Sequence, residues 1–348
     1  MDATYPGRAT ALRALRGGHG WGVLPGLALA IAVAAAATAL ASVVPLVGGP
    51  VLGIVLGVAV ATVSRPGAGL DPGIAFAGRN VLQLAVVVLG AQLSLGEVAK
   101  VGLHSLPVLL GTLAACLAIA PLLGRALGIS RDLRTLIGVG TGICGASAIA
   151  AVTPVIGAAE VDVAFAISTI FLFNVAAVLL FPLIGHALGL SQHAFGVFAG
   201  TAVNDTSSVV AAATTYGHSA ARTAVVVKLT RTLMIVPICV GLAASRGKVA
   251  SGPGRLRRLG GQARVVPAFL VAFLVLAAAN SAGAIPLSSD HALCRTATLL
   301  ITVALAGVGL SIDLGGLRRT GPRPLVLGAA LWVTVGATSL LLQSLTGL

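Results

Sequence analysis

Charged residues are scarce in this sequence of 348 residues. Only 9% of them are Asp, Glu, Lys or Arg, whereas soluble globular domains carry about 25%. A soluble protein with so little charge, 57% hydrophobic residues and a mean hydropathy of +1.05 would expose large apolar patches to water. The shortage of charge therefore excludes an ordinary soluble enzyme.

Aromatic residues and cysteines are also few. Aromatics make up 4% of the chain, and the net charge is +13. The basic residues fall between long apolar runs. This distribution is typical of the loops of a membrane protein and not of a nucleic-acid-binding surface. The cysteines form no CxxC pair and the six histidines have no metal-ligand spacing. We expect no metal, no cofactor and no nucleic-acid partner, and we interpret the cysteines as small apolar side chains: Cys116, Cys144, Cys239 and Cys294.

Long apolar runs dominate what is present. A helix needs about 20 apolar residues to cross the hydrocarbon core, and only helices or closed barrels satisfy the backbone there. The sequence predicts an all-α polytopic membrane protein with about 11 (10–11) transmembrane helices in a single domain, residues 22–346. The spans are 22–44, 48–64, 79–96, 105–124, 134–157, 162–185, 194–215, 222–244, 265–283, 296–312 and 324–346.

The distribution of basic residues predicts the orientation. With a cytoplasmic N-terminus, 17 Lys and Arg lie in inside segments and three in outside loops, which the positive-inside rule favours. Residues 1–21 are then a cytoplasmic segment, and 246–264 form a basic cytoplasmic linker. Three arginines and Ala39-Leu40-Ala41 make the first span resemble a signal peptide, but its apolar run is longer than such peptides need. We expect a retained helix.

Two internal similarities suggest repeats. The segment from Val86 to Gly111 recurs 217 residues later, with Gly90 and Ser94 matching Gly307 and Ser311. The copies would run in opposite directions, as in inverted-repeat transporters. Chance similarity between Gly/Leu-rich helices is the alternative.

The second similarity has an offset of 60 residues. It aligns GTGICGASAIAAVTPVIG from Gly140 with GTAVNDTSSVVAAATTYG from Gly200. Both stretches begin with Gly, Thr and Ser, which are poor helix formers. Breaks of this kind in corresponding helices mark transporter binding sites, although close helix packing through small residues explains them as well.

Three charges lie deep within predicted spans, away from the span ends: Asp205, Lys228 and Arg231. Each costs about 2.5–3.5 kcal/mol at mid-bilayer on insertion scales. Their sum is +1, so either Lys228 is deprotonated or an anion completes the neutralisation. The alternative to a binding role is a structural one, in which Lys228 and Arg231 form an ion-pair network with Asp205.

Several stretches closely resemble the "putative sulfate exporter" family of bacterial multi-pass inner-membrane proteins, which belongs to the bile-acid/arsenite/riboflavin transporter superfamily. They are Asn80–Leu95, Gly140–Ala151, Gly200–Ala212, Lys228–Pro237 and Ala304–Leu314. The resemblance implies two inverted repeats of about five helices, roughly 48–185 and 194–346, with broken helices crossing near the midplane.

That fold would pair span 134–157 with span 296–312, in competition with the repeat at offset 217. The family often has His where this chain has Asn204, which argues against a proton-linked role for that position here. The resemblance also places the chain in the bacterial cytoplasmic membrane.

We expect a secondary transporter and no enzyme, because no nucleophile–base–orienter set can be assembled. Its partners would be a small anionic solute, the lipid bilayer and a possible second copy of the chain. The solute would be sulfate or an organosulfonate, exported. The alternatives are Na⁺- or H⁺-coupled organic-anion uptake and an intramembrane enzyme. The predicted substrate-binding residues are Thr141, Gly142, Cys144, Gly145, Ser147, Asn204, Asp205, Thr206, Ser207, Lys228 and Arg231.

Overall fold

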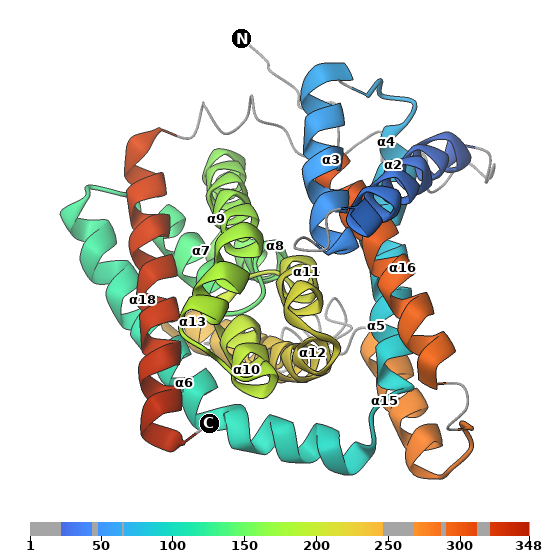
Figure 1. Ribbon diagram of the computed structural model, residues 1–348. Coiled ribbons are helices and arrows are strands. Elements are labelled where there is room, and N and C mark those ends of the chain that lie inside the picture. The colour runs from blue at the N-terminus through green and yellow to red at the C-terminus, as the bar shows by residue number, and fades with distance from the viewer. Residues whose placement is uncertain are drawn as a thin grey trace, which may run out of the picture. The chain divides into compact units, whose positions relative to one another are not determined.

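The computed structural model describes residues 22–43, 48–64, 66–245, 268–286, 290–311 and 321–347, and every regular element in these ranges is a helix (Figure 1). In chain order they are α2 (Leu24–Val43), α3 (Gly49–Ser64), α4 (Asp71–Phe76), the π-helix η2 (Ala77–Val81), α5 (Leu82–Gly90), α6 (Leu95–Ala126), α7 (Arg131–Gly142), α8 (Ala146–Ile156), α9 (Glu160–Ala187), α10 (Gln192–Ala202), α11 (Thr206–Tyr216), α12 (His218–Thr232), α13 (Ile235–Ser245), α15 (Ala268–Ser281), α16 (Asp290–Leu310) and α18 (Pro322–Thr346).

The expectation of an all-α polytopic membrane protein is confirmed, because each of the eleven predicted spans coincides with helix. Seven helical stretches among the described residues are long and apolar enough to cross a membrane, and shorter apolar helices accompany them. Three spans, 134–157, 194–215 and 222–244, consist of two helices each. The predicted segments 1–21 and 246–264 lie outside the described residues.

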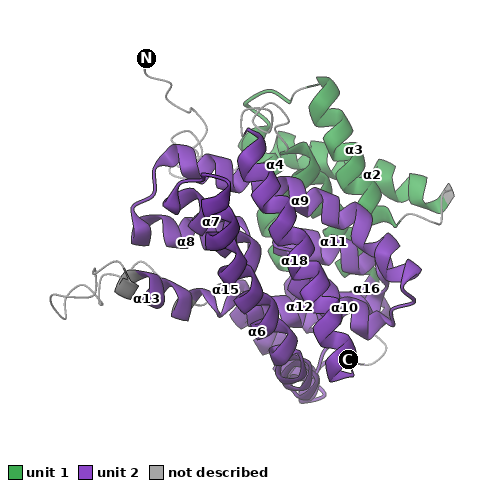
Figure 2. Cartoon of the chain, turned by 90° about the vertical axis from the view of Figure 1, so that its left-hand side faces the viewer, with its two compact units in different colours: residues 1–85, 295–313 green, residues 86–294, 314–348 purple. Residues whose placement is uncertain are grey.

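The chain forms two compact units (Figure 2). Unit 1 comprises residues 1–85 and 295–313. Its helices approach closely through glycines: a Cβ on Gly57 would lie 3.0 Å from the Cα of Gly309, and one on Gly26 would lie 2.9 Å from the Cα of Gly73. Small residues let helix backbones pack in this way when water supplies no driving force.

Unit 2 comprises residues 86–294 and 314–348. Helix α6 begins with a capping box between Ser94 and Glu97 and packs against α7 and α18, while α10 packs against α12. A stack of aromatic rings joins α9, α10 and α18, with Phe181 4.6 Å from Phe198 and 5.0 Å from Trp332 between ring centroids. Unit 2 holds the three interrupted spans and all the predicted site residues.

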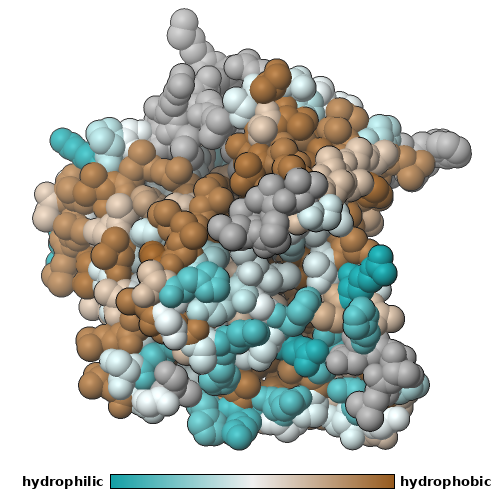
Figure 3. All heavy atoms as spheres, viewed as in Figure 1, coloured by the Kyte–Doolittle hydropathy of each residue, from teal (hydrophilic) through white to brown (hydrophobic). Residues whose placement is uncertain are grey.

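Apolar side chains cover broad areas of the surface in Figure 3. Exposed leucines and valines on the long helices face outward, which suits contact with lipid tails: Val63, Leu103, Leu122, Leu183 and Leu345.

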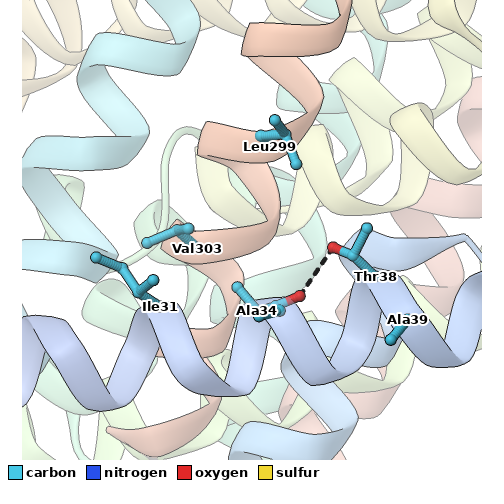
Figure 4. A pocket seen from close by; sticks show the side chains of 7 residues that line it. Ile31, Ala34, Thr38, Ala39, Leu299 and Val303 are labelled. Atoms are coloured by element: carbon cyan, nitrogen blue, oxygen red, sulfur yellow. Dashed lines mark hydrogen bonds between the residues drawn. The ribbon is translucent and has the colours of Figure 1, made fainter.

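Unit 1 also has an open groove of about 480 Å³ between α2 and α16 (Figure 4). The hydroxyl of Thr38 donates to the Ala34 carbonyl, and none of the described lining residues is charged. The groove therefore lacks a group that would select a polar solute. Its lining residues are Ile31, Ala34, Ala35, Thr38, Ala39, Leu299 and Val303.

Candidate functional site

The first helix break separates α7 from α8. The hydroxyl of Ser130 caps the start of α7 by accepting from the Leu133 amide at 3.2 Å. Three glycines weaken the last turn of α7, which ends at Gly142. Gly145 then adopts φ +66° and ψ −131°, a conformation that residues with a Cβ rarely adopt. A new helix axis consequently begins at Ala146.

The last carbonyls of α7 divide into two groups. The Val139 and Gly140 oxygens accept from backbone amides of the break, at 3.0 and 2.9 Å. The Thr141 and Gly142 oxygens instead accept from the side chain of Arg231. Helix C-termini leave carbonyls without intrahelical donors, and here a side chain of α12 supplies the donors.

The second break separates α10 from α11, at Val203, Asn204 and Asp205. The Asp205 carboxylate caps α11 by accepting from the Ser207 amide at 3.1 Å and the Ser208 amide at 3.3 Å. Both serine hydroxyls also donate to its Oδ2. Asp is among the strongest N-cap residues, so the NDTSS sequence starts a helix.

The two breaks are in contact. A Cβ built on Gly145 would lie 3.3 Å from the Cβ of Asp205, closer than ordinary van der Waals contact between such atoms. The absence of a side chain at Gly145 thus lets the start of α8 approach the start of α11. The offset-60 similarity corresponds to this pair of broken helices, whereas α16 runs unbroken from Asp290 to Leu310.

Lys228 and Arg231 of α12 link the breaks, and both side chains are 0% exposed. The Lys228 ammonium donates to the carbonyls of Ile143 at 2.8 Å and Val203 at 2.9 Å. The Arg231 guanidinium donates to Gly142 at 2.7 Å and to Thr141 at 2.8 Å, with a longer contact of 3.4 Å to Val203. Each cation therefore bonds to the ends of both α7 and α10.

Two buried polar side chains at the breaks have no hydrogen-bond partner among the described residues. They are Asn204, whose amide nitrogen and oxygen are both unpaired, and Thr141, whose hydroxyl is unpaired. Each residue is 1% exposed. Leaving a buried polar group unpaired costs about 1–3 kcal/mol, so such groups are candidates for binding a ligand.

A family model described as conserved hypothetical protein 698 matches residues 25–328. A UPF0324 membrane protein of Streptococcus pyogenes serotype M3 is 42% identical over 334 residues, covering 93% of this chain and 98% of that protein. The corresponding protein of Fusobacterium nucleatum is 37% identical over 345 residues, covering 93% and 99%. This chain belongs to the UPF0324 family.

The UPF0324 family is the "putative sulfate exporter" family that the sequence motifs indicate, so that resemblance is confirmed. The names of its members establish a membrane protein, and the apolar helices of the structure make it multi-pass.

Six of the eleven predicted site residues of this UPF0324 protein have a clear role in the structure. Gly142 and Gly145 shape the first break, Asp205 and Ser207 cap α11, and the two cations bond to backbone carbonyls. Cys144 is buried with 6% exposure, whereas Ser147 is exposed and Thr206 half-buried. Among the described residues, Lys228 and Arg231 donate to main-chain carbonyls and not to the Asp205 carboxylate.

The sequence interpretation missed the acceptors of these two cations. They are main-chain oxygens of Thr141, Gly142, Ile143 and Val203, and main-chain oxygens carry no signal in the sequence. Ser208 is a second hydroxyl donor to Asp205; its place in the NDTSS block and the N-cap rule together indicate it.

Proposed function

We propose that this UPF0324 protein is a secondary transporter, and not an enzyme, that exports a small anion such as sulfate or an organosulfonate. It would lie in the bacterial cytoplasmic membrane with its N-terminus in the cytoplasm, as the distribution of basic residues favours. The anion would bind where the two helix breaks meet.

The observation that carries this proposal is an asymmetry between the two helix starts. Asp205 places a negative charge at the N-terminus of α11, but the N-cap of α8 is Gly145, which offers no side-chain cap. The first turn of α8 is exposed at Ala146 and Ser147. The amides and the dipole of a helix N-terminus make such a start attractive to anions.

Two further features support an anion at this position. The unpaired Asn204 side chain is adjacent to Asp205, which packs on Gly145, and its amide nitrogen can donate to an oxyanion. The charges of Lys228, Arg231 and Asp205 sum to +1 inside the membrane domain, and an anion would lower the cost of that excess charge.

The membrane potential supports export as the direction. An inside-negative potential of about 100 mV favours outward movement of a divalent anion by about 4.6 kcal/mol, at about 2.3 kcal/mol per charge. Export by uniport then requires no coupling ion. Cation-coupled uptake through Asp205 is less well supported, because both carboxylate oxygens already accept hydrogen bonds from Ser207 and Ser208.

Counterflow in proteoliposomes tests the proposal. Purified protein should accelerate exchange of labelled sulfate, or of a small organosulfonate, over protein-free vesicles. Chemical conversion of the solute without its movement across the membrane would contradict the transporter assignment. Anion exchange equal to that of empty vesicles for every small oxyanion tested would contradict the solute class.

Replacing Asn204 with leucine should change anion affinity and protein stability in opposite directions. The variant removes two unpaired buried atoms, so the empty protein should gain stability by about 1 kcal/mol, while anion affinity falls at least tenfold, or about 1.4 kcal/mol. Asn174→Leu in α9 is the matched control, because Asn174 is also buried with an unpaired oxygen. Melting curves with and without sulfate measure both effects. An Asn204→Leu variant with wild-type sulfate response would remove Asn204 from the site.

Two substitutions of Asp205 distinguish the anion account from the cation-coupled one. Asn is as good an N-cap as Asp, so Asp205→Asn should fold normally and bind sulfate at least as tightly as the wild type. Asp205→Ala should lose about 1 kcal/mol through the missing cap. Flux is measured with and without Na⁺. A Na⁺-stimulated wild-type flux that Asp205→Asn loses would favour cation-coupled uptake.

A further inference from the structure

The ends of α7 and α10 form a cluster of backbone carbonyl oxygens inside unit 2, contributed by Thr141, Gly142, Ile143 and Val203. Each helix end carries a partial negative charge. Carbonyls at the ends of broken helices are the groups that bind Na⁺ in many secondary transporters. These oxygens therefore have the chemistry of a cation site.

That site already contains two cations, and both belong to the chain. The Lys228 ammonium is held between one carbonyl from each break, at 2.8 and 2.9 Å. The Arg231 guanidinium covers the remaining oxygens of α7. Both side chains are 0% exposed, so water does not compete for these carbonyls in this conformation.

We propose that Lys228 and Arg231 are built-in counter-cations that occupy a carbonyl cage, and that removing the Lys228 side chain converts the cage into a site for a free monovalent cation. This inference deepens the proposed function, since a transporter carrying its own cations needs no Na⁺ from solution. Lysine suits the test because its ammonium is a compact charge on a flexible stem.

The Lys228→Ala variant defines a specific probe. The atoms lost are three methylenes and the ammonium, which correspond to n-propylammonium. A probe that binds only the folded protein raises its stability by mass action. We expect n-propylammonium to raise the melting temperature of purified Lys228→Ala by about 3 °C over choline at equal ionic strength, and Na⁺ to produce a smaller rise.

Two controls use the same salts. Wild-type protein and Lys100→Ala, which removes an exposed lysine of α6, should melt at the same temperature in n-propylammonium, Na⁺ and choline. If neither n-propylammonium nor Na⁺ stabilises Lys228→Ala above choline, the cage is refuted. A Na⁺-specific stabilisation of the wild type would also overturn it, and that measurement applies even if the variant does not fold.

The melting experiment needs no knowledge of the solute. Stabilisation of Lys228→Ala by n-propylammonium together with absent anion flux would support the cage and reject the proposed function. Robust wild-type anion flux that requires Na⁺ would support a transporter and reject the role of Lys228 and Arg231 as built-in counter-cations.

Discussion

The Arg231→Leu variant is expected to lose anion flux and to be less stable than the wild type by about 3 kcal/mol or more. The substitution removes the hydrogen bonds to Thr141, Gly142 and Val203. The Thr141 and Gly142 carbonyls then stay buried without this donor, at about 1–3 kcal/mol for each unsatisfied group, whereas Val203 still accepts from Lys228. The loss of the guanidinium also leaves the ends of α7 and α10 with the Lys228 ammonium as their one remaining counter-charge among the described contacts.

Thermal unfolding in detergent and flux in proteoliposomes measure the two consequences. Arg131→Leu is the control, because Arg131 is exposed at the start of α7 and exposed substitutions usually change stability by less than about 0.5 kcal/mol. Arg231→Lys should be intermediate, since it keeps the charge but not the planar set of donors. A stable Arg231→Leu protein with normal flux would show that the cation is dispensable.

The Gly145→Ala variant should lose about 1–3 kcal/mol of stability and at least tenfold in flux. Its φ of +66° and ψ of −131° lie where side chains are rarely tolerated. The added Cβ would also lie 3.3 Å from the Cβ of Asp205, so one break must shift away from the other. Gly145→Leu should abolish flux, because the larger side chain cannot fit between the two breaks.

Gly189→Ala separates backbone strain from the contact between breaks. Gly189 also has a positive φ, of +64°, but a Cβ there would meet nothing within 4 Å. This control should lose some stability and keep its flux. Gly142→Leu provides a second test, since a Cβ there would lie 3.2 Å from Leu113. Normal expression and flux in both Gly142→Leu and Gly145→Leu would refute close backbone approach at the first break.

The membrane class and the positions of the spans could be predicted because both depend on local composition. Whether about 20 residues enter lipid is a matter of their summed transfer free energies, largely independent of the rest of the chain. The two breaks were predictable for a similar reason. Gly140 and Gly142 in one stretch, and Asn204 and Asp205 in the other, are poor helix formers or good caps regardless of their neighbours in space.

The pairing of the broken helices was only partly predictable. The superfamily pattern pairs 134–157 with 296–312, whereas the offset-60 similarity pairs 134–157 with 194–215, and both of these are broken in the structure. Helix α16 stays continuous over Asp290–Leu310. Sequence similarity between short Gly-rich stretches does not establish shared ancestry, so the inverted repeat at offset 217 stays a prediction.

The sequence by itself determined that this chain is a multi-pass helical membrane protein and that Asp205, Lys228 and Arg231 lie within predicted spans, and it indicated breaks in the stretches from Gly140 and Gly200. Only the tertiary structure decided what the three charges contact. Asp205 caps its own helix, and the two cations bond to carbonyls that lie 25 to 90 residues away in the chain. The physical reason is that every residue has a carbonyl, so packing alone selects which carbonyls lose their helical donors and meet a buried cation.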